Sequence, residues 1–469
     1  MNLLFGKLRG HVLNGRTVLL IASESVLIVA SILVAAGIRL TVPGLMDLIG
    51  AGLFWRAGLI ALVLQVCLHF CDLYDLRTLS DRRATVTALL QALGVASLVL
   101  AFLYYWVPSL IIGRGVVVIA SVLIVAIIAG WRIAFDWLSL TLEPAERLLI
   151  LGTNAAAVDL ARELFARRRE LGVELVGFVD SDPGRVGTPL INPGIIGTVG
   201  DIPSIVRQHR VDRVVVSLSD ARGKLSMEEL LRIKLKDGVR FDHLASVYEE
   251  YTGKIAVENL RPSWLIFSEG FRRQRAQAAV KRSFDVLCAA FGLAVAAPVM
   301  AVVAVAIRRT SAGPALYTQR RVGMDGRTFI IYKFRSMRAD AEQETGAVWS
   351  TEGDPRVTPL GRFLRRTRLD ELPQLWNVLR GDMSIVGPRP ERPEFVSDLT
   401  EQIPFYGQRH AVRPGVTGWA QVRHSYGASV EDALQKLQYD LFYIKHISLT
   451  FDLFVVLETI KTVLVRRGS

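Results

Sequence analysis

Residues 281–309 read KRSFDVLCAAFGLAVAAPVMAVVAVAIRR, a long apolar run with two basic residues at each end. The run is long enough to cross a bilayer, because a spanning helix needs about 20 apolar residues. Basic residues favour the cytoplasmic side of a membrane, however, and here Lys281 and Arg282 precede the run while Arg308 and Arg309 follow it. Both ends of the segment are therefore expected on the same, cytoplasmic side.

A proline inside this run bears on its topology. Pro298 removes a helical hydrogen bond and favours a kink. A helix over residues 283–307 that enters the membrane, bends at Ala297–Pro298 and returns would satisfy the length, the charges and the proline together. The alternative is a plain fifth spanning helix. We predict the re-entrant helix, with Lys281, Arg282 and Pro298 as its characteristic residues.

Further apolar segments open the chain, and each is close to the length of a spanning helix. They are Thr17–Ile38, Gly52–Cys71, Thr85–Val107 and Gly115–Trp131. They predict four transmembrane helices within residues 1–140. Glu24 lies in the middle of the first segment, where a charge costs about 3 kcal/mol, so it is expected to face other helices.

Basic residues in the loops indicate how these helices are oriented. One set of loops carries Lys7, Arg9, Arg16, Arg77, Arg82 and Arg83, whereas the alternate loops offer mainly Arg39 and Arg114. The positive-inside rule then puts the N-terminus and everything after the fourth helix in the cytoplasm.

Residues 145–255 alternate strand-like and helical patterns, which predicts a small parallel sheet in a Rossmann-like cytoplasmic module. The first strand leads through Gly152 into a helix, but a dinucleotide fingerprint needs three glycines there. Asn154 or Ala155 stands where the second glycine would let the backbone approach a pyrophosphate. A regulatory or structural module is therefore favoured over cofactor binding. Residues 256–280 are expected to form a linker.

The composition limits the kinds of partner that the protein can bind. The chain has 469 residues, 51% of them apolar, yet it carries 56 Lys and Arg and a net charge of +12. Such segregation of apolar and basic stretches is typical of a membrane protein with anionic partners. No nucleic-acid-binding motif accompanies the charge, so no nucleic acid is expected. The three cysteines lie in apolar segments without a disulfide pattern, and the seven histidines have no metal-ligand spacing.

The candidate catalytic motifs lie in residues 281–469. The most informative is the string LDELPQLWNVL, which begins at Leu369. Its leucines and tryptophan recur at helical spacing, and Pro373 is tolerated only in a first turn. Asp370 therefore lies at or near an N-cap, with Glu371 in the first turn. Ordinary capping would explain an isolated string of this kind. The cluster of arginines that precedes it instead favours a phosphate site, with Mg²⁺ held by oxygen ligands; the cluster is Arg362, Arg365, Arg366 and Arg368. Within it, Arg362 and Arg366 are expected on a solvated or lipid-facing surface.

Four strings together resemble the bacterial sugar transferase family, the monotopic polyprenyl-phosphate phosphoglycosyl transferases. They are YTQRRVGMDGRTFIIYKFRSMRAD, the stretch from GDPRVTPLG through DELPQLWNVLRGDMSIVGPRPERPEF, VRPGVTGWAQV, and the tail YDLFYIKHISLTFDLFVVLETIKTV. The larger members carry four N-terminal helices and a Rossmann-like module, like this chain. LRPSWLIFSEGF (residues 260–271) is similar to a subgroup associated with exopolysaccharide clusters. The resemblance implies a multi-pass bacterial inner-membrane protein whose α/β catalytic domain (281–469) is on the cytoplasmic face.

The resemblance also implies a reaction. Asp370 would attack the β-phosphate of a UDP-sugar, releasing UMP, and the hexose phosphate would then pass to undecaprenyl phosphate in a membrane. Asp370 and Glu371 would hold Mg²⁺, and the other implied substrate-binding residues are Lys333, Arg335, Asp354, Arg356, Thr358, Arg365 and Arg389. The family commonly has Ser-Pro in its re-entrant helix, where this chain has Ala297–Pro298.

Two other functions are weighed against this one. A membrane nucleotide-sugar dehydratase or epimerase would need a full glycine fingerprint and a Tyr-x-x-x-Lys pair, which the chain lacks. A non-catalytic scaffold or sensor of polysaccharide assembly is disfavoured by the intact Asp370–Glu371 pair and the GPRP string at Arg389. The sequence leaves open which sugar is used, although UDP-glucose or UDP-galactose is the first expectation. A homodimer through the additional module is compatible with it.

Two C-terminal segments are expected near the membrane. Residues 449–465 have helical apolar spacing interrupted by charges, which is typical of an amphipathic helix on a membrane or a domain surface. The loop at residues 412–422 contains Trp419, a residue type suited to a membrane interface.

Overall fold

The computed structural model describes residues 15–71, 73–74, 82–142, 145–217, 227–257, 268, 270–271, 275–338, 340–341, 354–424, 427 and 429–465. Lys7, Arg9, Arg77 and most of the LRPSWLIFSEGF string lie outside the described residues. The chain divides into two compact units, Met1–Val247 and Tyr248–Ser469. The division precedes the expected module boundary at residue 255 by a few residues.

The N-terminal unit begins with long apolar helices. They are α2 (Gly15–Arg39), the short α3 (Val42–Gly50), α4 (Leu53–Phe70), α5 (Arg82–Trp106) and α6 (Arg114–Leu142). In the described part of the chain, five helices are long and apolar enough to cross a membrane. Four of them are α2, α4, α5 and α6, at the segments expected from the sequence.

A buried ion pair joins two of these helices. Glu24 in α2 is fully buried, and one of its carboxylate oxygens lies 2.6 Å from Nε of Arg132 in α6. The Tyr74 hydroxyl donates a hydrogen bond of 2.6 Å to the same carboxylate. A buried charge left without a partner is strongly destabilising, so this pairing explains how Glu24 is accommodated. The expectation that Glu24 faces other helices is confirmed, and its partner is Arg132.

A parallel five-stranded sheet follows in the order β3-β2-β1-β4-β5. Its strands are β1 (Glu146–Leu151), β2 (Val173–Asp180), β3 (Ile195–Thr198), β4 (Arg213–Val216) and β5 (Arg240–His243). The accompanying helices are α7 (Ala155–Ala166), α8 (Arg168–Leu171), α9 (Ile202–His209), α10 (Met227–Lys236) and α11 (Leu244–Thr252). The central strands are apolar and buried, as expected for a parallel sheet covered on both faces.

The turn between β1 and α7 differs from a dinucleotide-binding turn. Gly152 has a φ of 109°, and Asn154 caps α7 by accepting a hydrogen bond from the Ala157 backbone N–H. The Asn154 amide also donates to Ser217 Oγ at the end of β4. A side chain thus occupies the place where a fingerprint glycine would leave room for a pyrophosphate.

The C-terminal unit is built on one long helix, a hairpin and a set of short helices. Its elements are α13 (Arg275–Thr310), β6 (Leu316–Val322), β7 (Thr328–Phe334), α14 (Pro359–Arg366), the 3₁₀ turn η7 (Leu369–Glu371), α15 (Gln374–Arg380), β8 (Ser384–Val386), α16 (Pro393–Gln402), η8 (Tyr406–Ala411), β9 (Gly415–Thr417), α17 (Trp419–Arg423), α18 (Val430–Lys445) and α19 (Leu449–Val465). Strands β6 and β7 pair antiparallel, whereas β8 and β9 pair parallel.

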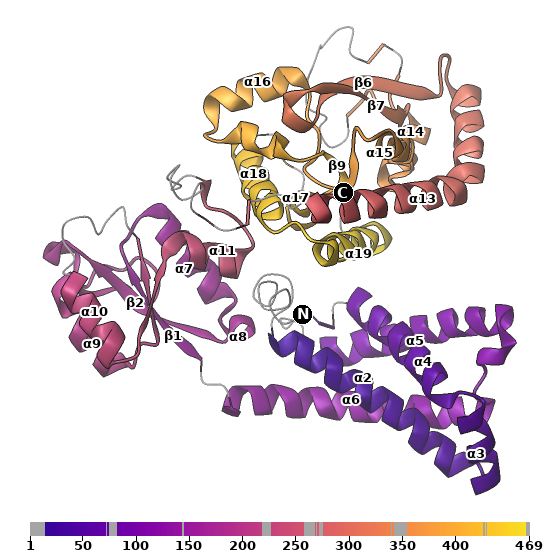
Figure 1. Cartoon of the computed structure of the whole chain (residues 1–469), viewed down its shortest axis with the longest axis horizontal. Coiled ribbons are helices and arrows are strands. Elements are labelled where there is room, and N and C mark those ends of the chain that lie inside the picture. The colour runs from indigo at the N-terminus through magenta and orange to yellow at the C-terminus, as the bar shows by residue number, and fades with distance from the viewer. Residues whose placement is uncertain are drawn as a thin grey trace. The chain divides into compact units, whose positions relative to one another are not determined.

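Helix α13 contains Pro298 and changes direction along its length, turning toward β6 in its last part (Figure 1). Only 11% of its most apolar stretch is buried within the protein. Phe291, Val295 and Val302 are among its large exposed apolar residues. This helix is the fifth that is long and apolar enough to enter a membrane.

The expected position of Trp419 at a membrane interface is wrong. Trp419 is 2% exposed and packs against Phe442 and Phe451 in an aromatic cluster. Its Nε1 donates to the Gly253 carbonyl, so the residue fastens the start of this unit to its core. Helix α19 packs against this unit through the buried Phe451 and Val455, whereas Leu453 and Leu457 are exposed, so its outward side is also apolar.

Candidate active site

The Asp370–Glu371 pair lies in a sharp turn between α14 and α15. Thr358 caps α14 through its hydroxyl, which accepts from the Gly361 N–H. A Cβ on Gly361 would lie 1.9 Å from the Ser336 carbonyl oxygen, so only glycine allows α14 to approach the end of β7 this closely. Arg368 then adopts a left-handed conformation with φ of 57°, which a non-glycine residue adopts at a cost of about 1–3 kcal/mol. The turn leaves both carboxylates 8% exposed.

Three cations surround Glu371. Its Oε1 lies 2.9 Å from Nη2 of Arg389, 3.5 Å from Nζ of Lys333 in β7 and 3.9 Å from Nη1 of Arg368. Burial alone would raise the pKa of Glu371, but these cations outweigh it and hold the pKa well below its usual range. Glu371 is therefore a fixed anion at the base of the site.

Asp370 differs from its neighbour. Burial and the adjacent Glu371 charge raise the pKa of Asp370 to about 6, against the opposing effect of Lys333, Arg365 and Arg368. Its Oδ1 is buried and has no hydrogen-bond partner among the described residues. Two neighbouring carboxyl groups with pKa values pushed apart are typical of sites where each has a separate chemical role.

The loop carrying Arg389 is itself held by a buried ion pair. Arg409 in η8 donates through Nη2 to the Arg389 carbonyl at 3.0 Å and to Asp440 in α18 at 2.8 Å. Its Nη1 donates to the Tyr406 hydroxyl at 2.7 Å. Arg409 and Asp440 were not among the residues predicted from the sequence, since they lie in otherwise unremarkable segments and meet only through the fold.

Several predicted substrate-binding residues make structural contacts. The guanidinium of Arg335 donates to the carbonyls of Ser311 and Ala312 just after α13. Asp354 and Arg356 form a bidentate pair, and hydrogen bonds from Arg356 lower the pKa of Asp354 to about 2. Thr358 is the helix cap already described. The fold thus explains these four residues without a ligand.

Arg365, unlike those four residues, acts electrostatically on the Asp370–Glu371 pair. Its Nε donates to Ser336 Oγ at 2.9 Å, and its charge lowers the pKa values of both Asp354 and Asp370. Together with Lys333, Arg368 and Arg389, it surrounds the pair with positive charge. Such a cluster is suited to binding phosphate.

The two basic residues at the start of the apolar run fasten α13 to this unit. Lys281 Nζ contacts Asp452 in α19 at 2.7 Å and the Val386 carbonyl at 3.1 Å. Arg282 donates to the carbonyls of Val378 and Leu379, at the C-terminal end of α15. A cation at a helix C-terminus is stabilising, so α13 directly supports the helix that follows Asp370.

The donor set fits a hard divalent cation only with additional ligands. Among the described residues, no group of three or more His, Cys, Asp or Glu side chains comes together. Asp370 and Glu371 supply two carboxylates, and Asp370 Oδ1 is without a protein partner in the described part of the chain. Mg²⁺ is commonly held in this way, by one or two carboxylates plus substrate phosphates and water.

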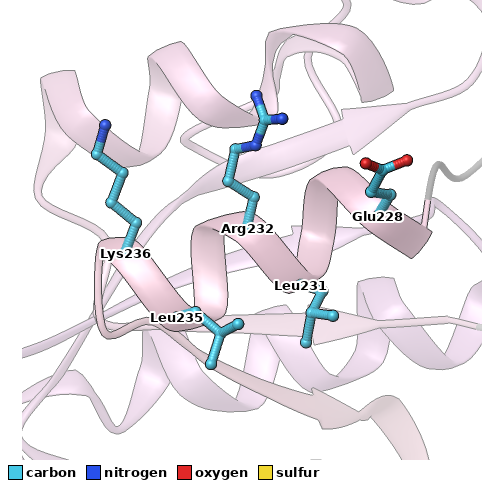
Figure 2. A pocket seen from close by; sticks show the side chains of 5 residues that line it. All are labelled: Glu228, Leu231, Arg232, Leu235 and Lys236. Atoms are coloured by element: carbon cyan, nitrogen blue, oxygen red, sulfur yellow. The ribbon is translucent and has the colours of Figure 1, made fainter.

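A separate surface hollow lies on α10 and contains none of these residues. It is lined by Glu228, Leu231, Arg232, Leu235 and Lys236. Figure 2 shows the two leucines on one side of the helix and the charged side chains on the other. Leu231 and Leu235 are both exposed, so the apolar side of α10 lies on the surface.

Comparison with known proteins identifies the family. A family model described as bacterial sugar transferase matches residues 276–466. UDP-glucose:undecaprenyl-phosphate glucose-1-phosphate transferase of Escherichia coli (strain K12) is 33% identical over 328 residues, which cover 67% of each chain. The chain belongs to the bacterial sugar transferase family. The site above lies within the matched region of this sugar transferase.

Other relatives extend the similarity. UDP-N-acetylgalactosamine-undecaprenyl-phosphate N-acetylgalactosaminephosphotransferase of Aeromonas hydrophila is 40% identical over 260 residues, 55% of this chain and 60% of the relative. Undecaprenyl-phosphate glucose phosphotransferase of Komagataeibacter xylinus is 34% identical over 339 residues, 71% of this chain and 61% of the relative. The chain therefore spans about three fifths of these two relatives. A family model described as CoA-binding domain matches residues 69–239.

Proposed function

We propose that this sugar transferase moves a hexose 1-phosphate from a UDP-sugar to undecaprenyl phosphate at the cytoplasmic face of the bacterial inner membrane. The observation that carries the proposal is the buried Asp370, with a free carboxylate oxygen beside a fixed anion and four cations. The relatives' names supply the reaction class, because three of them are undecaprenyl-phosphate sugar-phosphate transferases. The product would begin the assembly of an exopolysaccharide or another surface glycan.

The first step is an attack on the donor. A carboxylate oxygen of Asp370 bonds to the β-phosphorus of the UDP-sugar, and the bond between that phosphorus and the bridging oxygen breaks. UMP leaves with the bridging oxygen, and the sugar phosphate is held on Asp370 as an acyl phosphate. Lys333, Arg365, Arg368 and Arg389 compensate the phosphate charge. Mg²⁺, bound by Asp370 and Glu371 with substrate phosphates, would supply further charge stabilisation when present.

The second step regenerates the carboxylate. A phosphate oxygen of undecaprenyl phosphate bonds to the same phosphorus, and the bond to the Asp370 oxygen breaks. The lipid diphosphosugar is released, and Asp370 returns to its ionised form. Dividing one displacement into two through a covalent intermediate lowers the barrier of each.

Helix α13 supports a re-entrant membrane anchor for this reaction. Its charged ends, its Pro298 and its change of direction suit a helix that enters and leaves on one side (Figure 1). Its start contacts the end of α15 through Arg282, and its end is capped by Arg335. The active site would thereby stay at the membrane surface, where a lipid phosphate and a water-soluble donor can both reach it. The α2, α4, α5 and α6 helices would form the separate four-helix anchor, and the parallel sheet a Rossmann-like module.

UMP release from a panel of UDP-sugars tests the function. Purified protein in detergent or native lipid would be given Mg²⁺, undecaprenyl phosphate and each donor in turn. We expect UMP from one donor or a small group, with the matching lipid diphosphosugar formed in equal amount. No UMP from any donor, with folded protein and lipid present, would instead favour a scaffold in polysaccharide assembly.

The pKa of Asp370 predicts the pH dependence of the first step. Asp370 attacks only as the carboxylate, and its pKa is raised to about 6, so the second-order rate constant of single-turnover UMP release without lipid acceptor should fall about tenfold per pH unit below pH 6. Omitting the acceptor keeps its own phosphate titration out of the profile. Glu371→Gln removes the neighbouring charge that raises this pKa, so the residual activity should show its acid limb at lower pH. An unchanged limb in that variant would contradict the assignment to Asp370.

A further inference from the structure

A second buried polar group lies one helical turn after Asp370. Gln374 is 2% exposed, and its Nε2 is buried without a hydrogen-bond partner among the described residues. A buried amide donor without an acceptor destabilises a protein by its full desolvation cost. Such a group in a native structure requires an explanation, and an acceptor supplied by a ligand is one.

The backbone keeps Gln374 close to Asp370. Leu372 and Pro373 both have right-handed helical conformations, so the chain continues helically from η7 into α15. The backbone hydrogen bonds here run from residue i to residue i−3, as from Leu372 N–H to the Leu369 carbonyl and from Leu375 N–H to the Leu372 carbonyl. The four-residue step from Asp370 to Gln374 therefore makes a little more than one 3₁₀ turn and rises about 8 Å. One turn further on, Asn377 exchanges hydrogen bonds with the Tyr332 N–H and the Ile330 carbonyl of β7. Gln374 therefore lies between the carboxylate pair and the place where α15 is fastened to β7.

The chemistry of the two unpartnered atoms limits the ligand. Asp370 Oδ1 is an acceptor or a nucleophile, whereas the Gln374 amide nitrogen is only a donor. A cation would contact the first and not the second. A phosphoryl group satisfies both, because its phosphorus takes the carboxylate oxygen while its non-bridging oxygens accept hydrogen bonds.

We infer that Gln374 is a catalytic residue that donates a hydrogen bond to a non-bridging oxygen of the phosphoryl group transferred to Asp370. The inference rests on the proposed function. The donor would act most strongly when negative charge builds up on that oxygen, as in other oxyanion-binding sites. No bond is made or broken at Gln374 itself.

Gln374→Met and Gln374→Glu test the inference in the full-length protein. Methionine has a similar size but no donor, and glutamate replaces the amide with an acceptor and a charge. Single-turnover UMP release from the best UDP-sugar should slow by about 10²–10³-fold in Gln374→Met, mainly in the maximal rate at saturating donor, and at least as much in Gln374→Glu. Gln402→Met, at an exposed position in α16, should leave the rate unchanged.

Thermal unfolding without substrate gives a second readout. Because the methionine removes a buried unpaired donor, Gln374→Met should unfold at a higher temperature than the wild type while it is less active. A Gln374→Met rate within threefold of wild type, or a lower unfolding temperature, would overturn the inference and leave the proposed function standing. If Gln374→Met does not fold, the Gln374→Glu rate decides in the same way. A wild-type protein that releases no UMP from any donor would overturn both.

Discussion

Asp370→Asn should abolish UMP release from the donor, with a loss of about 10³-fold or more, because it removes the attacking carboxylate. Asparagine has nearly the same shape, so the turn between α14 and α15 should persist. The buried Oδ1 has no protein hydrogen-bond partner among the described residues, so no protein contact is lost there. The measurement is single-turnover UMP release with and without undecaprenyl phosphate.

The matched control is Asp398→Asn, at an exposed position in α16. It changes the net charge by the same amount and should keep wild-type activity. An Asp370→Asn variant that kept more than a tenth of the rate would show that another group attacks the donor. Circular dichroism and thermal unfolding would show whether both variants are folded.

Arg409→Met should destabilise the C-terminal unit by about 3–5 kcal/mol, because it leaves the Asp440 carboxylate buried without its cation. The two side chains are 5% and 2% exposed and lie 2.8 Å apart. The same change removes the hydrogen bond to the Arg389 carbonyl, so the loop beside Glu371 should also lose its support. Denaturant or thermal unfolding of the purified protein gives the stability.

A double variant distinguishes the effect of the unpaired Asp440 charge from a general loss of packing. Arg409→Met with Asp440→Leu removes both charges, and replacing a buried pair with apolar residues is often neutral. It should therefore recover most of the lost stability. If the double variant is as unstable as Arg409→Met alone, the buried Asp440 charge is not the cause.

Features encoded locally could be predicted from the sequence. The apolar segments at α2, α4, α5 and α6 and the amphipathic helix after Asp370 follow from composition and periodicity within one segment. The parallel sheet follows from alternating strands and helices. These patterns need no knowledge of the rest of the fold.

Features formed by residues far apart in the sequence could not be predicted from it. Arg132 contacts Glu24, and Arg409 contacts Asp440, only once the helices have packed. No spacing in the sequence predicts either pair. Arg335 is part of a basic string that resembles an anion site, yet it caps the end of α13. Trp419 has the residue type of an interface, but its surroundings, Phe442 and Phe451, bury it. Residue type is thus a weaker guide than the contacts that tertiary structure provides.

The central claim is a sugar phosphate carried on Asp370, and intact-protein mass spectrometry tests it most directly. The active UDP-sugar would be mixed with wild-type protein and Mg²⁺ without undecaprenyl phosphate, quenched in acid, and the modified peptide sequenced. We predict a mass increase of one sugar phosphate on the peptide containing Asp370, which disappears when undecaprenyl phosphate is added. A wild-type protein that forms the lipid product in full, while no adduct appears at any time after mixing, would contradict the covalent route and favour direct transfer.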